Sequence, residues 1–160
     1  MMKKLILSLA LSLLGATAVF AEAKCGFWYD APEGIGSKSV EGAAFGIPVG
    51  DFKNVDGAQI SILGSQAQKV KGFQGSIVLN KMAVHRGGCQ FGIVNFVTDS
   101  IEKKGAQVGF YNQSASGGIQ VGFVNNGRDN SWLQVGLVNI NEDGLFPVMI
   151  FVNFDKDFFD

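Results

Sequence analysis

Few residues in this 160-residue chain could carry acid–base or metal chemistry. The single histidine, His85, falls in a connector at residues 83–88, where an exposed loop histidine is the ordinary interpretation. Zinc sites use three or four Cys or His ligands. The one His and two Cys of this chain cannot plausibly assemble such a site. Glu142 and Asp143 lack the periodic acidic loops of calcium-binding repeats. We therefore expect no catalytic residue, no metal site and no cofactor, and hence a non-enzymatic protein.

The two cysteines, Cys25 and Cys89, are the other side chains that could react chemically. In an exported protein, an isolated pair most simply forms one bridge. We predict this disulfide, which would tie an irregular N-terminal segment to the third or fourth unit of the repeat described next. An alternative for Cys89 is burial, since it takes the same slot as Ile119 and Leu133 in their units.

Amide side chains recur at a regular spacing. The unit Gln, apolar, Gly, apolar, apolar, Asn begins at Gln90, Gln107, Gln120 and Gln134. Asparagines spaced 13 to 17 residues apart close successive units, at Asn80, Asn95, Asn112, Asn125, Asn139 and Asn153. Because each unit alternates with period two and has no helical spacing, each unit is predicted to be a strand.

The alternation divides each strand into two faces. We predict that the apolar face is buried, namely Ile60, Ile62, Phe91, Ile93, Val108, Phe110, Val121, Phe123, Val135 and Leu137. The other face would then form a flat contact surface for a partner or a second copy, made of Gln90, Gly92, Gln107, Gly109, Gln120, Gly122, Gln134 and Gly136. In the last unit Val148 and Ile150 occupy those outward slots, and we expect the chain's own ends to cover them.

The spacing of the units predicts an all-β fold. A β-solenoid of about seven to eight short coils is favoured, because neighbouring units resemble each other and would stack like on like. The alternative is a small antiparallel β-barrel or meander, although the strands are short for a membrane-spanning barrel. The expected organisation is a signal peptide, an irregular N-terminal segment, the β-repeat domain and a C-terminal tail, at residues 1–23, 24–41, 42–154 and 155–160.

The N-terminus is expected to be an export signal. Two lysines precede the apolar stretch 5–20, and small residues follow, which allows cleavage after Ala21 or Ala23. An uncleaved anchor is the alternative, for which the stretch is short. The net charge of −1 and the lack of a long basic run argue against a nucleic-acid partner.

The repeat resembles a known family. The segments 118–125 and 132–139 resemble the tandem units of bacterial surface-repeat-containing proteins, which read Gly, Leu or Val, Gln, Ile, Gly, Leu, Val or Ile, Asn. The segment 144–154 is similar to the Pro-containing apolar segment that ends such arrays. The resemblance implies export to the periplasm, outer membrane or cell surface, and no reaction. We expect a structural or binding module with an envelope or extracellular partner or with self-association. A small outer-membrane barrel, with membrane association, is the alternative.

Overall fold

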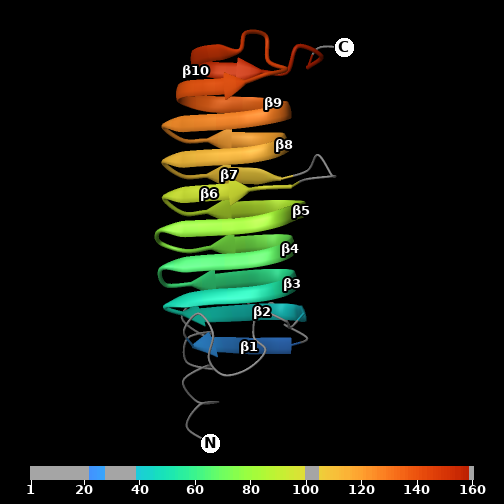
Figure 1. Cartoon of the computed structure of the whole chain (residues 1–160), viewed down its shortest axis with the longest axis vertical. Helices are drawn as coiled ribbons and strands as arrows, with labels where there is room; N and C mark the ends of the chain where they lie inside the picture. The colour runs from blue at the N-terminus through green and yellow to red at the C-terminus, as the bar shows by residue number, and fades with distance from the viewer. Residues whose placement is uncertain (1–21, 28–38, 100–104, 159–160) are drawn as a thin grey trace, which may run out of the picture.

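The computed structural model describes residues 22–27, 39–99 and 105–158, with the backbone alone at 22–27, 85–86, 116–117 and 129–130. These residues form flat coils that stack along one axis, with β1 at one end and β10 at the other (Figure 1). The strands are β1 (Glu22–Phe27), β2 (Ser39–Ile47), β3 (Val49–Ser61), β4 (Gly64–Gly75), β5 (Leu79–Phe91), β6 (Val94–Val97), β7 (Ala106–Val108), β8 (Tyr111–Val121), β9 (Val124–Asn141) and β10 (Val148–Phe154).

Successive coils pair in parallel, which confirms the predicted solenoid. Val108 pairs with Val121, and Val121 pairs with Val135, so equivalent positions of neighbouring units stack directly. This parallel ladder rules out the antiparallel barrel or meander. The solenoid has about six turns, fewer than the seven to eight predicted. The difference lies partly at the C-terminal end, where β10 runs antiparallel to β9 and closes the stack instead of adding a coil.

The N-terminal boundary differs from the prediction in one respect. Strand β1 lies largely within the segment 24–41 that was expected to be irregular, and it pairs in parallel with β2. Residues 1–21, which hold most of the predicted signal peptide, lie outside the described residues. Within the described ranges, the structure contains no helix with the length and hydropathy that a membrane span requires.

One corner of the N-terminal coils is built from a column of glycines. Gly42, Gly57, Gly72 and Gly88 follow one another in register, and their φ angles are 132°, 133°, 120° and 110°. A Cβ on Gly57 would lie against the carbonyl oxygen of Gly42, and each later glycine meets the glycine before it in the same way. Only glycine combines this backbone conformation with so close an approach, so this column fixes where the coil turns.

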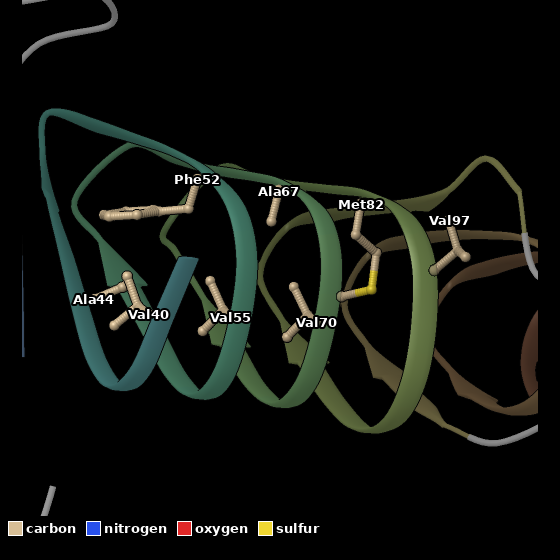
Figure 2. Close-up of a cluster of buried hydrophobic side chains, with 8 residues drawn as sticks. All are labelled: Val40, Ala44, Phe52, Val55, Ala67, Val70, Met82 and Val97. Atoms are coloured by element: carbon tan, nitrogen blue, oxygen red, sulfur yellow. The ribbon is translucent and has the colours of Figure 1, made fainter. Parts of the chain in front are cut away.

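The hydrophobic core occupies the N-terminal coils only. Figure 2 shows its side chains inside the coils: Val40, Ala44, Phe52, Val55, Ala67, Val70, Met82 and Val97. Further along the axis, the slot of Met82 and Val97 passes in register to Ser114 and then to Gly127. The interior of the C-terminal coils is therefore filled by polar and small residues.

Candidate contact surface

The predicted assignment of the two strand faces is wrong, because the glutamines point into the solenoid. Gln90 and Gln134 are fully buried, whereas Val121 is 41% exposed and Phe123 51% exposed. The residues predicted as core are mostly exposed instead: Ile60, Ile62, Phe91, Ile93, Val108, Phe110, Val121, Phe123, Val135 and Leu137. The predicted contact face turns inward: its glutamines Gln90, Gln107, Gln120 and Gln134 are buried, and its glycines Gly92, Gly109, Gly122 and Gly136 are buried or half-buried against the coil before them.

Burial of the glutamines is possible because they form a continuous hydrogen-bonded ladder. The Nε2 of each glutamine donates to the Oε1 of the glutamine one coil earlier, at 2.7 Å from Gln120 to Gln107 and 2.7 Å from Gln134 to Gln120. The second Nε2 proton goes to a backbone carbonyl of the following strand, as in the 3.0 Å bond from Gln107 to Gln113. Both donor protons and one acceptor lone pair are thus used, which removes most of the cost of burying an amide.

The asparagines form a second ladder with the opposite polarity. The Nδ2 of Asn95 donates to the Oδ1 of Asn112 at 2.8 Å, and Asn112 donates to Asn125 at 2.9 Å, so donation runs towards the C-terminus. The Nδ2 atoms of Asn80, Asn95, Asn112 and Asn125 also donate to a carbonyl at the bend of the next coil, as from Asn112 to Val121 at 2.9 Å. The asparagines therefore hold the bends in place from inside, and the dipoles of the two amide ladders oppose each other.

Each ladder ends in an acceptor without a partner. Gln134 Oε1 and Asn80 Oδ1 are buried and accept no hydrogen bond in the structure. Asn153 of β10 stands in register with Gln134 but directs its Nδ2 to the Phe146 carbonyl at 2.9 Å. Ser65 stands in register with Asn80 and bonds to Ser61 and Gly75. The ladders thus stop where the residue in register no longer supplies an amide donor.

The glycine after each ladder glutamine is required by close packing inside the coil. A Cβ on Gly109 would meet the carbonyl oxygen of Gly92 and, at 2.5 Å, the Nδ2 of Asn95. Gly122 and Gly136 have the same relation to the coil before them. The glycine rank is therefore packed closely between coils on its inner side, and it does not form a flat contact surface of its own.

The outward positions form two apolar ridges along the solenoid axis. The first ridge follows the glutamines and contains Ile60, Phe91, Val108, Val121 and Val135, which are 38–59% exposed. The second ridge lies at the bends and contains Ile47, Ile62, Ile77, Ile93, Phe110, Phe123 and Leu137, which are 42–62% exposed. Phe110 and Phe123 stack with their ring centroids 4.7 Å apart. We call the two ridges together the apolar flank.

A groove of about 770 Å³ runs between the two ridges. Its lining includes Phe91 and Phe110 from the ridges and the small residues Ser76, Gly92 and Gly109 between them. Gly75 takes the first-ridge slot between Ile60 and Phe91, so the ridge is interrupted there and the groove is open. The apolar flank is therefore a ridged surface with a small-residue floor.

Charged side chains lie away from the apolar flank. Among the described side chains, neither ridge carries a charged residue, whereas the N-terminal halves of β3, β4 and β5, on the other side of the coil, expose Lys53, Lys69 and Lys81. Lys71 Nζ and Asp56 Oδ2 form an exposed ion pair at 3.3 Å on this side. The charged side chains thus lie on the flank opposite the ridges, which we call the polar flank, where Leu63, Val78 and Leu79 are also exposed beside Lys81.

The C-terminal end carries a further apolar patch, which the chain ends do not cover as predicted. Val148 is 59% exposed and Ile150 is 66% exposed. Strand β1, with Cys25, lies at the opposite end of the stack (Figure 1). Phe158 packs against Phe154, with centroids 6.0 Å apart, and leaves Val148 and Ile150 exposed.

The predicted disulfide is not formed, since Cys89 is a free thiol. Cys25 belongs to β1, and Cys89 belongs to β5, with β2, β3 and β4 between these strands. Four strand spacings amount to about 19 Å, whereas a disulfide requires Cα atoms roughly 5.5 to 6 Å apart. The prediction failed because it treated the chain around Cys25 as irregular and able to reach over a coil end. The side chain of Cys25 itself lies outside the described part of the chain.

The repeat itself carried a signal for the true orientation. The inward slots hold the same residue in coil after coil, Gln, Gly or Asn, while the outward slots vary among Val, Ile, Phe and Leu. A hydrogen-bonded ladder requires identity from coil to coil, whereas an outward apolar slot requires only an apolar side chain. Invariance within the repeat, and not hydrophobicity, marks the interior of this solenoid.

Comparison of the chain with protein-family models, curated proteins and solved structures gave no match. The resemblance to bacterial surface-repeat-containing proteins therefore remains a prediction from the repeat residues.

Proposed function

We propose that this chain is a non-enzymatic, exported β-repeat protein of the bacterial envelope or cell surface, and that it acts as a structural or binding module through its apolar flank. The observation that carries the proposal is the flank itself, two uncharged ridges that extend over most of the solenoid. Monomeric soluble proteins seldom expose a continuous apolar patch larger than about 300–600 Å², and larger patches usually mark interaction sites.

The twelve side chains of the two ridges, each 38–62% exposed, together present on the order of 1,000 Å² of apolar surface. Water contact with so large an area is unfavourable, by about 25 cal/mol for each Å². Covering the flank would remove this cost. A binding role through the flank therefore follows more directly from the structure than any role for the polar flank.

Export is supported by the sequence of the N-terminus and tested by expression of the full chain in a bacterial host. We expect the protein in the envelope or medium fraction, with the mass of a chain that begins at Glu22 or Lys24. The matched control replaces Leu13→Arg and Leu14→Arg within the apolar stretch, which should keep the chain unprocessed in the cytoplasm. A wild-type chain that stays cytoplasmic and full-length would contradict the export part of the proposal.

The binding role is tested with a pair of charge-matched variants. Phe110→Glu with Phe123→Glu places two charges on the second ridge, and Gln113→Glu with Asn126→Glu places two charges on the polar flank of the same coils. At a protein concentration at which the chain is monomeric, we expect the wild type and the polar-flank variant to enhance the fluorescence of the apolar dye anilinonaphthalene sulfonate, and the ridge variant to lose most of this enhancement. Equal enhancement in all three folded proteins would show that the flank is not the apolar binding surface.

A further inference from the structure

The size of the apolar flank matches the interface of a stable protein dimer. Its exposed apolar area, on the order of 1,000 Å², exceeds the roughly 800 Å² that each partner contributes to a standard interface. The Gly75 gap beside the protruding Phe91, 59% exposed, adds a hollow and a knob to the same surface. The flank therefore has the area, and the relief, that a specific protein interface requires.

The chemistry of the flank suits contact with itself. A two-fold interface places the same patch of both subunits in contact, so any charge near its centre faces a like charge. Among the described side chains, the ridges hold none, and the exposed Lys53, Lys69 and Lys81 lie on the polar flank. Self-contact of the apolar flank thus buries no unpaired charge, while contact of the polar flank would.

The spacing of the ridges also favours a second copy over other occupants. Ridge side chains repeat once per coil, at the strand spacing of about 4.8 Å. A second solenoid presents the same spacing, so that the side chains of two flanks interdigitate coil by coil as in packed β-sheets, about 10 Å apart. A bilayer or a globular partner presents no such repeat to match the ridges coil by coil.

Building on the proposed binding role of the flank, we infer that its partner is a second copy of this chain, packed flank to flank about a two-fold axis. The two ridges and the groove form the interface, the charged residues of both copies remain in water, and the open end strands stay outside the contact. The exported form is then a dimer with an apolar seam along its length.

The inference is tested by sedimentation velocity of the exported, processed chain over a range of concentrations. We expect a dimer that dissociates only on dilution. Phe110→Glu with Phe123→Glu should weaken the dimer by at least about 100-fold, because four charges meet in one seam. The control Gln113→Glu with Asn126→Glu, which has the same net charge, should keep the wild-type dissociation constant. Circular dichroism establishes that both variants are folded.

Several outcomes would overturn the inference. A wild-type chain that remains monomeric up to about 100 µM excludes the dimer, as does a dimer that the ridge variant leaves unchanged. Binding of the monomeric wild type, but not of the ridge variant, to neutral phosphatidylcholine vesicles would replace the second copy with a lipid surface and leave the proposed function standing. If the ridge variant changes neither self-association nor dye or vesicle binding, both the inference and the proposed function fail.

Discussion

The N-terminal and C-terminal coils share one backbone path but have different interiors. Between Ser39 and Val97, apolar side chains such as Phe52 and Met82 fill the coil beside the glutamine ladder. Between Ala106 and Asn141, the interior is made of glutamine and asparagine ladders together with serine and glycine. The stability of the first interior depends on apolar side chains that fill its volume. The stability of the second depends on each neighbouring coil supplying a hydrogen-bond donor and an acceptor.

The polar inward slots explain why one flank of the solenoid is apolar. Where amides and glycines occupy every inward slot, the alternation of the strand leaves only outward slots for Val, Ile and Phe. The apolar flank is thus the counterpart of the polar interior. The two regions should therefore respond differently to the same kind of substitution.

The largest effect is expected for a methyl group in the glycine rank. Gly122→Ala places a Cβ against the carbonyl of Gly109, and 2.6 Å from the Nδ2 of Asn112, so we expect a loss of more than about 4 kcal/mol in unfolding free energy. The control is Gly64→Ala in the N-terminal coils, where the nearest atom is 3.5 Å away and the change should stay within about 1 kcal/mol. Urea unfolding followed by circular dichroism measures both. Equal effects would show that the glycine rank is not closely packed between the coils.

The next effect separates inside from outside. Phe52 is 1% exposed, and Phe52→Ala should cost about 3 to 5 kcal/mol as a cavity-forming change. Phe123 is 51% exposed, so Phe123→Ala should cost only about 1 kcal/mol, chiefly its stack on Phe110. Thermal unfolding at a concentration where the chain is monomeric compares the two. A larger loss for Phe123→Ala would restore the orientation that hydrophobicity alone suggests.

A smaller effect is expected within the ladders. Gln120→Leu leaves Gln107 Oε1 without its donor and Gln134 Nε2 without its acceptor, which should cost about 3 kcal/mol. Met82→Leu, a similar change of shape in the apolar interior, should cost less than about 1.5 kcal/mol. The same urea titration decides between them. If Gln120→Leu were neutral, the ladders would contribute nothing to stability.

The smallest effect concerns the cysteines. Because Cys89 is a free thiol, dithiothreitol should change the unfolding free energy by less than about 0.5 kcal/mol, whereas a bridge closing so long a loop would contribute about 4 kcal/mol. Mass spectrometry without reductant should find Cys89 open to alkylation in the unfolded chain. A chain two hydrogens lighter, with Cys25 and Cys89 linked, would contradict the separation of β1 and β5.

The sequence predicted the coils and their register but not their orientation. The spacing of Gln107, Gln120 and Gln134 was enough to stack the units correctly, because parallel register follows from like on like. Alternation with period two defines two faces without saying which one is inside. The usual preference for apolar burial then gave the wrong answer, since the partners that satisfy a buried glutamine come from the coils above and below it.

The sequence also did not predict the antiparallel direction of β10 or the pairing of strand β1. The unit ending in Asn153 keeps the asparagine of the repeat but not its glutamine or glycine, and nothing in this pattern indicates that the chain turns back at residues 142–147. The resemblance of this segment to the element that ends such arrays predicted that the repeat stops here, but not that the last strand runs antiparallel. Strand β1 lacks the repeat motif, so pairing with β2 is visible only in three dimensions.

Side-chain amide hydrogen exchange tests the central claim that the amide ladders are inside. In two-dimensional NMR spectra recorded after transfer to D₂O, the side-chain NH₂ signals of Gln107, Gln120 and Asn112 should outlast that of the exposed Gln68 by at least about 100-fold in time. Exchange of the ladder amides as fast as that of Gln68 would place them in water and contradict the account.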